Sequence, residues 1–300
     1  MITLHDVDDV RRCCDDARRA GRTVALVPTM GGFHEGHRSL MRAARADADL
    51  VVVSLFVNPT QFGPDEDLEA YPRDLAGDAA VAAAEGVDVL FAPNVDAMYP
   101  ATAPRTTVHV DGLTARLCGA SRPTHFDGVA TVVTKLFSIV GACTAYFGRK
   151  DAQQLAVVRR LAADLNLPVT VVGCPLVRDP DGLARSSRNT YLDADQRRAA
   201  TVLHRALGEA AEAVQAGERD AAALSERTAR TIQAEPGVRL DYAELVDAST
   251  VEPVTQVDGD LFLAVAAYVG PTHLIDNLHI TATTAGVDTD LGVVAEEQRA

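Results

Sequence analysis

The sequence predicts an α/β protein: a parallel sheet with helices on both faces, followed by a smaller α+β domain. Two observations predict this fold class. Strand-like and helix-like segments alternate through the first 175 residues, which is typical of βαβ units. After residue 175, two charged, alanine-rich helical segments precede three segments of alternating polarity, which is typical of a small antiparallel sheet. A length of 300 residues is enough for two ordinary domains.

Short apolar, β-branched segments in the first half predict strands that are covered on both faces. They lie at residues 23–27, 50–57, 87–92, 143–147 and 169–172. Amphipathic or alanine-rich segments between them predict helices. These lie at residues 6–20, 35–46, 75–85, 128–140 and 152–165. Ligands of such sheets bind beyond the carboxyl ends of the strands, so functional residues are expected at those ends.

The second half predicts a different architecture. Helices are expected at 193–216 and 220–235, and strands at 238–246, 260–268 and 272–280. We therefore expect a first domain over 1–175, a smaller C-terminal lid domain over 176–282, and a mobile tail over 283–300. The tail is expected because its residues lack periodicity and bulk.

Composition excludes several classes of protein. A formal net charge of −14 disfavours a sequence-independent nucleic-acid binder. The five cysteines show no zinc-site spacing, which favours reduced thiols in a cytoplasmic protein. No apolar run approaches the roughly 20 residues that span a bilayer, and the first residues carry no basic leader, so we expect neither a membrane anchor nor a secretory signal.

The strongest local motif lies at residues 28–37, between a predicted strand and a predicted helix. His34 and His37 are three residues apart, so one helical turn would place both on one side. Gly31 and Gly36 would let a ligand approach the backbone, and a helix start attracts anions. The spacing favours a nucleotide phosphate site, while a metal pair or two surface histidines also fit it.

Further polar residues follow other strands or precede helices. Asn58 and Gln61 could orient a polar substrate, but Asn-Pro is equally a turn signal. Arg122 and His125 precede an apolar helix, for which Asp127 is also an ordinary N-cap.

Two basic segments complete the set of candidates. Lys150 lies at a predicted helix start, where a point charge suits phosphate, although a solvated charge cluster also fits. Ser186, Ser187 and Arg188 lie in a loop at the domain junction that could close over phosphates, although a basic hinge loop is an equal alternative.

Taken together, these motifs resemble the pantoate–β-alanine ligase family of the nucleotidyltransferase superfamily. The resemblance covers residues 2–280 and rests on five motifs in order: Pro-Thr-Met-Gly with His-x-Gly-His, Phe-Val-Asn-Pro-x-Gln-Phe, Arg-Pro-x-His-Phe-x-Gly-Val, Phe-Gly-x-Lys-Asp-x-Gln-Gln and Ser-Ser-Arg-Asn. It implies a Rossmann-like domain with a smaller C-terminal domain, a homodimer, and ATP with Mg²⁺ held mainly by phosphates and water.

The resemblance also implies the reaction: pantoate is adenylated by ATP, and β-alanine then displaces AMP to give pantothenate. The catalytic residues it implies are His34, His37, Lys150, Ser186, Ser187 and Arg188. The ATP contacts it implies are Met30, Gly31, Gly36, Gly148, Lys150, Asp151 and Val177. The pantoate site it implies comprises Gln61, Gln154, Met30, Val132, Val133 and Phe147, and the motifs themselves add Asn58, Arg122 and His125 as candidate substrate contacts. No metal ligand from the protein is expected.

Three residues depart from the family pattern. Arg149, Ala152 and Arg185 stand where the family usually has Glu, Tyr and Met. Two of these changes add positive charge close to expected phosphate contacts. One alternative is therefore a divergent paralogue that joins a related acid to a different amine. Another is a non-catalytic ATP-binding regulator, which the intact histidines, lysine and serine–arginine loop disfavour.

Overall fold

The computed structural model describes residues 1–64, 66–100 and 105–295. Contacts divide the chain into two compact units. The N-terminal unit contains residues 1–115, 119–148 and 157–174. The C-terminal unit contains residues 116–118 and 149–156 and the chain from residue 175 onward. The two short excursions into the C-terminal unit are not visible in the sequence pattern, and the lid role expected for residues 176–282 stays a prediction.

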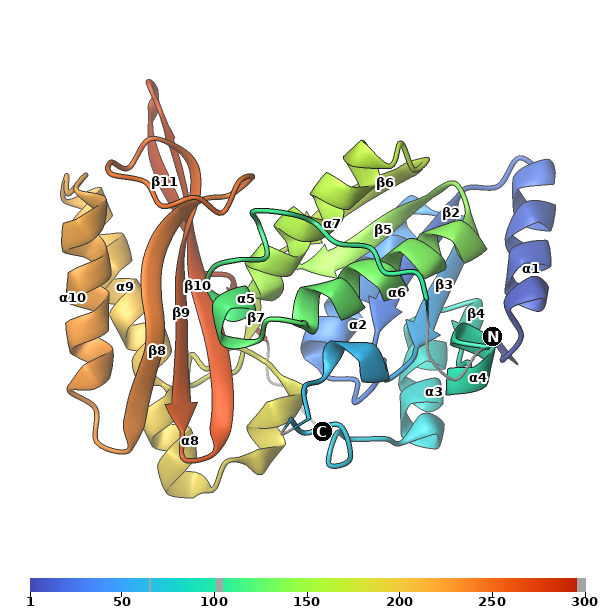
Figure 1. Cartoon of the computed structure of the whole chain (residues 1–300), viewed down its shortest axis with the longest axis horizontal. Helices are drawn as coiled ribbons and strands as arrows, with labels where there is room; N and C mark the ends of the chain where they lie inside the picture. Colours follow the sequence, from blue (N-terminus) through green and yellow to red (C-terminus); the bar gives the residue numbers. More distant parts are fainter. Residues whose placement is uncertain (65, 101–104, 296–300) are drawn as a thin grey trace. The chain divides into compact units, whose positions relative to one another are not determined.

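The N-terminal unit is built on a six-stranded, fully parallel sheet with strand order β1-β4-β3-β2-β5-β6 (Figure 1). The strands are β1 (Ile2–Leu4), β2 (Val24–Thr29), β3 (Leu50–Leu55), β4 (Val89–Phe91), β5 (Cys143–Gly148) and β6 (Val169–Cys174). The helices of this half of the chain are α1 (Val7–Arg19), α2 (Glu35–Asp47), α3 (Leu75–Ala84), α4 (Val95–Met98), α5 (Cys118–Ser121), α6 (His125–Val140) and α7 (Ala152–Asp164). The α/β class is therefore confirmed.

Helices cover both faces of this sheet, as the apolar strands predict. Ala25 and Val27 of β2 pack in a buried cluster with Met41 and Ala44 of α2. Leu26 points to the other face, because side chains alternate along a strand, and it is also fully buried. Figure 1 shows α6 in front of the sheet and α2 behind it.

The C-terminal unit contains a four-stranded antiparallel sheet of order β11-β10-β9-β8. Its strands are β8 (Val238–Asp247), β9 (Gly259–Val269), β10 (Thr272–Thr283) and β11 (Gly286–Asp290). Its helices are α8 (Ala194–Ala200), α9 (Val202–Gln215) and α10 (Ala221–Gln233). Alternate residues of β9, such as Leu261 and Leu263, share a core with α9 and α10. Figure 1 shows these two helices beside the sheet.

Two expectations for this unit are wrong. The segment 193–216 is two helices, because Thr201 breaks it between α8 and α9. The segment 283–300 is not simply a mobile tail: β11 pairs with β10, and β12 (Val293–Val294) pairs in parallel with β7 (Val177–Arg178). Backbone pairing forms these short strands, and their polar or short sequences carry no period that would reveal them. Residues 296–300 of the expected tail lie outside the described residues.

No helix in the described parts of the chain is long and apolar enough to cross a membrane.

Candidate active site

The loop after β2 is shaped by a buried carboxylate on α3. Gly31 and Gly32 have positive φ angles of 89° and 65°, which glycine adopts without strain. Their turn brings the N–H groups of Gly32 and Phe33 to the Asp78 carboxylate, at 2.9 Å and 2.7 Å. Burial raises the pKa of Asp78, and the two backbone hydrogen bonds oppose that rise. Both N–H groups therefore hold the loop in place, and both are already hydrogen-bonded to Asp78.

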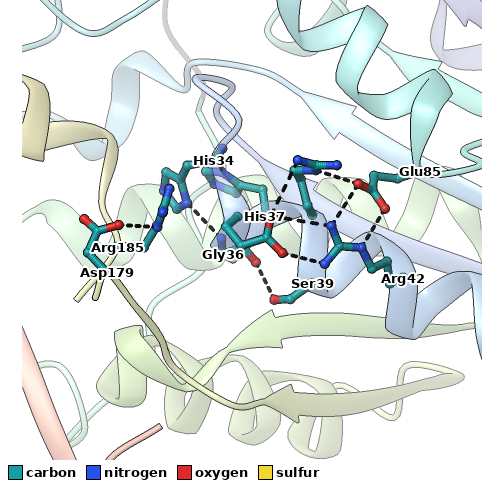
Figure 2. Close-up of polar contacts among 10 residues, drawn as sticks. His34, Gly36, His37, Ser39, Arg42, Glu85, Asp179 and Arg185 are labelled. Atoms are coloured by element: carbon teal, nitrogen blue, oxygen red, sulfur yellow. Dashed lines mark hydrogen bonds and ion pairs between the residues drawn. The ribbon is translucent and has the colours of Figure 1, made fainter. Parts of the chain in front are cut away.

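His34 and His37 are brought together by a helix cap. His34 is the N-cap of α2, and its Nδ1 accepts from the Gly36 N–H at 3.1 Å (Figure 2). The His34 N–H in turn points at Nδ1 of His37, at 3.3 Å. The two ring centroids are 4.1 Å apart. The proximity expected from helical spacing is present, but its cause is this reciprocal cap.

The cap also fixes where the imidazole protons lie. Because Nδ1 accepts a hydrogen bond in both His34 and His37, each neutral ring carries its proton on Nε2. The N–H groups of Gly36, His37 and Arg38 all donate to His34. The expectation that this helix start offers free N–H groups is therefore wrong for these three.

An ion-pair network holds the first turns of α2. Nε of Arg42 lies 2.8 Å from the Glu85 carboxylate (Figure 2). Nε of Arg38 lies 2.5 Å from the same carboxylate, and Nη1 of Arg42 lies 2.5 Å from Glu35. Burial favours the neutral form of Glu85, but the hydrogen bonds from Arg42 and Arg38 lower its pKa overall. The network ties the start of α2 to the end of α3.

Asn58, after β3, is buried and has all its hydrogen-bonding capacity filled. Its Nδ2 donates to Gln61 Oε1 and to the Gly128 carbonyl, each at 3.1 Å. Its Oδ1 accepts from the Thr60 hydroxyl at 3.0 Å and the Tyr99 hydroxyl at 2.8 Å. Two donors and two acceptors are thus used, so Asn58 holds Gln61 in place and has no capacity left for a substrate.

Gln61 ends the 3₁₀ turn η1 (Pro59–Gln61), and several neighbours hold it. Its Nε2 lies 3.1 Å from Sδ of Met30, which joins the glutamine to the β2 loop. Its carbonyl accepts from His125 Nδ1 at 2.8 Å and from Arg122 at 3.3 Å. Arg122 also forms a two-pronged ion pair with Glu66, whose pKa it lowers against the effect of burial. Arg122 and His125 therefore hold Gln61 in place by donating hydrogen bonds to its backbone carbonyl.

Gly128 lets α6 approach this turn. A Cβ at Gly128 would lie 2.3 Å from the Thr60 carbonyl oxygen and 2.6 Å from Cα of Gln61. Only glycine permits that approach. The helix begins at His125 with Thr124 as N-cap, so the expected start at residue 128 and the expected cap Asp127 are both wrong. Asp127 lies in the first turn and accepts from His109 at 2.7 Å.

The remaining pantoate-site candidates differ in their surroundings. Val132, Val133 and Phe147 are buried apolar residues of α6 and β5. In the C-terminal unit, Gln153 is buried and bonds to Cys118 N–H and the Arg116 carbonyl, whereas Gln154 is half-buried. Of the two adjacent glutamines, Gln153 is thus held by backbone groups and Gln154 is the more exposed residue.

Lys150 lies in the 3₁₀ turn η2 (Arg149–Asp151), directly before α7. Its Nζ is 3.5 Å from Asp151 Oδ1, and its side chain is 20% exposed. Asn277 of β10 donates to the carbonyls of Arg149 and Lys150, each at 2.9 Å. Gly148, at the end of β5, has open space where a Cβ would lie.

Ser186, Ser187 and Arg188 lie at the start of η3 (Ser187–Tyr191). The Ser186 hydroxyl caps this turn by accepting from the Arg188 N–H at 3.3 Å. Upstream, Val177 is buried in β7, and its carbonyl accepts from the Arg185 N–H at 2.9 Å. A bidentate, fully buried ion pair between Arg178 and Asp276 holds the base of the loop.

Carboxylates compensate both of the unusual positive charges. Arg185 is ion-paired with Asp179 (Figure 2), its Nε lying 2.5 Å from the carboxylate. Nη1 of Arg149 lies 3.2 Å from Asp290. The third departure, Ala152, is buried at the start of α7. Arg149 and Arg185 therefore do not simply add positive charge near the expected phosphate contacts, because each is ion-paired with a carboxylate.

Sequence reasoning missed four residues that hold the candidates: Asp78, Tyr99, Asp276 and Asn277. Tyr99 and Asp78 are separated in sequence from the motifs they support, so no spacing rule pointed to them. No group of three or more His, Cys, Asp or Glu in the described residues is arranged to hold a metal ion.

Comparison with known proteins agrees with the resemblance. The family model described as pantoate-beta-alanine ligase matches residues 2–279. A pantothenate synthetase of Heliobacterium modesticaldum is 56% identical over 278 residues, covering 93% of this chain and 99% of that protein. One of Pelotomaculum thermopropionicum is 52% identical over 277 residues, covering 92% and 98%.

Solved structures give the same result. The pantothenate synthetase of Thermus thermophilus matches with a TM-score of 0.87 and 46% identity, covering 92% of this chain and 98% of that one. The ligase of Francisella tularensis, complexed with beta-gamma ATP and beta-alanine, matches with a TM-score of 0.74 and 30% identity, covering 92% and 97%. The chain therefore belongs to the pantoate–β-alanine ligase family.

Proposed function

We propose that this protein condenses pantoate with β-alanine in two ATP-dependent steps. In the first, a pantoate carboxylate oxygen attacks the α-phosphorus of ATP, and the bond to pyrophosphate breaks. In the second, the amine of β-alanine attacks the acyl carbon, the bond to the AMP oxygen breaks, and a proton leaves the new amide nitrogen. Adenylation is needed because a free carboxylate is a poor acyl donor, whereas AMP is a good leaving group.

The paired imidazoles carry this proposal. The reciprocal cap holds the two rings 4.1 Å apart at the start of α2, so their imidazoles can bond phosphate oxygens that gain negative charge in the transition state. This role for His37 involves no proton transfer.

In this proposal, cationic and hydroxyl groups of the C-terminal unit bind the phosphates of ATP. Lys150, Ser186, Ser187 and Arg188 supply an ammonium, two hydroxyls and a guanidinium, which are ordinary phosphate ligands. Gly148, Asp151 and Val177, with Met30, Gly31 and Gly36, are the remaining proposed ATP contacts. That both sets of residues bind one triphosphate stays a prediction.

Pantoate is assigned to the amides of Gln61 and Gln154. Met30, Val132, Val133 and Phe147 supply an apolar surface suited to its gem-dimethyl group. The sequence motifs also suggested Asn58, Arg122 and His125 as direct contacts. Their bonds to Gln61 support a positioning role instead, because they fix both its side chain and its carbonyl.

We further propose that Mg²⁺ enters with ATP and keeps phosphate and water oxygens as its main ligands, as this hard ion prefers. Both oxygens of Asp78 already bond the β2 loop, which supports a site without a protein cage. Family resemblance leads us to propose a homodimer. A cytoplasmic location fits both the need for ATP and the five cysteines, which form no disulfide.

The divergent-paralogue alternative now rests on Ala152, since the charges of Arg149 and Arg185 are compensated.

Purified protein should be incubated with ATP, Mg²⁺ and a panel of acids and amines, with AMP and amide products quantified. We expect pantoate with β-alanine to give the highest kcat/KM. A better acid–amine pair, with pantoate or β-alanine inactive, would establish the paralogue and refute the proposal.

The triple variant Arg149→Glu, Ala152→Tyr, Arg185→Met restores the usual family residues and sharpens that test. If these positions only tune stability, its substrate preference will match that of the parent protein. A change of preferred amine would show that they select the substrate.

A further inference from the structure

We infer that Asn277 of β10 is a positioning residue for Lys150. The inference rests on the proposed function, in which Lys150 contacts phosphate. No sequence motif pointed to Asn277, which is 127 residues away from Lys150 along the chain. Both residues lie in the C-terminal unit.

The contact is made with one buried amide. Asn277 is 3% exposed, and both hydrogens of its Nδ2 are used: one on the Arg149 carbonyl and one on the Lys150 carbonyl, each at 2.9 Å. These are consecutive peptide groups of η2. Holding two consecutive carbonyls fixes the orientation of the turn, and therefore the direction in which the Lys150 side chain leaves it.

A neighbouring residue on the same face of β10 also reaches this turn. His279 lies two positions after Asn277, so their side chains share a face of the sheet. Burial, followed by the charge of Arg149, lowers the pKa of His279, while a hydrogen bond with the Arg149 backbone opposes the shift. Asp290 of β11, paired with His279 in register, forms the ion pair with the Arg149 side chain. Of Asn277, His279 and Asp290, only Asn277 hydrogen-bonds to the carbonyl of Lys150.

The preceding residue of β10 supports the other basic segment. Asp276 points to the opposite face, where its bidentate pair with Arg178 brings NH1 of Arg178 to the Gly182 carbonyl at 3.0 Å. The Asn277 N–H also donates to Asp276 Oδ1 at 2.7 Å. Two adjacent residues thus hold the Lys150 turn and the base of the loop that carries Ser186.

Lys150 depends on its backbone for placement. The Asp151 oxygen is 3.5 Å from Nζ, which is the long limit of a hydrogen bond, so this contact constrains the ammonium weakly. A long, rotatable side chain on a turn that shifts would lose its alignment with phosphate, and misplacement of about 1 Å can cost about 10²-fold in rate. The expected effect of losing Asn277 is therefore on catalysis as well as on stability.

The test is a double-mutant cycle on the first step. Single-turnover formation of the adenylate is measured for Asn277→Ala, Lys150→Ala and the double variant, with pantoate KM and thermal unfolding recorded for each. Asn277→Ser, which keeps one donor, is a milder second variant. Thr272→Val removes a buried polar group from the same strand and is the matched control.

If Asn277 acts through Lys150, Asn277→Ala lowers the rate about 10- to 100-fold while pantoate KM changes less than about 2-fold. Asn277→Ser falls between it and the parent, and Thr272→Val leaves the rate unchanged. In the Lys150→Ala background, Asn277→Ala costs less than about 3-fold, because the residue it positions is gone.

Effects of the two substitutions that multiply, or an unchanged rate in Asn277→Ala, would overturn the inference. An unchanged rate in Lys150→Ala would instead refute the phosphate role of Lys150 in the proposed function. The two failures are therefore distinguishable.

Discussion

The His34–His37 loop and the Lys150 turn are both phosphate-directed in the proposed function, yet different parts of the chain hold them. His34, Gly36 and His37 bond one another within four residues of sequence. The Lys150 turn is held by Asn277, on a strand far along the chain. The cap that pairs the two imidazoles is therefore encoded locally, although Asp78 anchors the preceding loop, whereas the Lys150 turn depends on correct packing of β10.

The largest expected effect breaks the locally held motif. His37→Ala removes a donor preorganised for phosphate, so adenylate formation should fall about 10²- to 10³-fold. The unfolding free energy should fall by at most about 0.5–2 kcal/mol, because the His37 ring accepts the His34 N–H in the cap of α2. Single-turnover kinetics measure the rate, and His109→Ala, at an exposed histidine, is the control. A His37→Ala rate equal to the parent would remove the imidazole from the mechanism.

The next effect concerns the close packing beneath Gln61. Gly128→Ala places a methyl group 2.3 Å from a carbonyl oxygen, so we expect a loss of about 3 kcal/mol in unfolding free energy and a higher pantoate KM. Gly208→Ala in α9, where a Cβ meets open space, should instead stabilise by about 0.5–1 kcal/mol. Chemical denaturation and steady-state kinetics compare them. Equal stability of the two variants would contradict the close approach of α6 to η1.

A smaller effect tests the carboxylate that holds the β2 loop. Asp78→Ala leaves the N–H groups of Gly32 and Phe33 without their acceptor, which should cost about 1–3 kcal/mol and slow adenylation. Asp78→Asn keeps one acceptor oxygen and removes a buried charge, so it should cost less. Denaturant titration checks the order. An Asn variant less stable than the Ala variant would show that the charge itself is required.

The smallest expected effect is on pH dependence. Burial lowers the pKa of His204 and His279 below the ordinary value of 6.5. The unfolded chain therefore binds protons first as pH falls, so their contribution to stability is full above pH 6.5 and is lost as pH drops towards the folded values. Unfolding free energy measured from pH 7.5 to 5 should decline, and His204→Gln should flatten the decline. A slope that the substitution leaves unchanged would contradict the assignment.

The sequence was sufficient for elements whose cause is local. The apolar segments that became β2, β3 and β5 were predicted because a strand buried on both faces leaves a continuous apolar run. The residues of the His-x-Gly-His motif were found, but their capping geometry was not. Periodicity could not reveal β11 or β12, which exist through pairing with β10 and β7.

Positioning residues were the main omission. Asn58, Arg122 and His125 were recognised as site residues, yet only the structure shows that they act on Gln61. Asp78 and Asn277 were absent from the candidates because a buried carboxylate or amide gives no periodic signal. Their partners are backbone groups, which look the same in every sequence.

Pantoate-dependent exchange of labelled pyrophosphate into ATP, measured without β-alanine, tests the central claim most directly. If a pantoyl adenylate forms reversibly on the enzyme, label enters ATP only when pantoate is present, and β-alanine is not required. Exchange that needs β-alanine, or that proceeds equally without pantoate, would contradict the account.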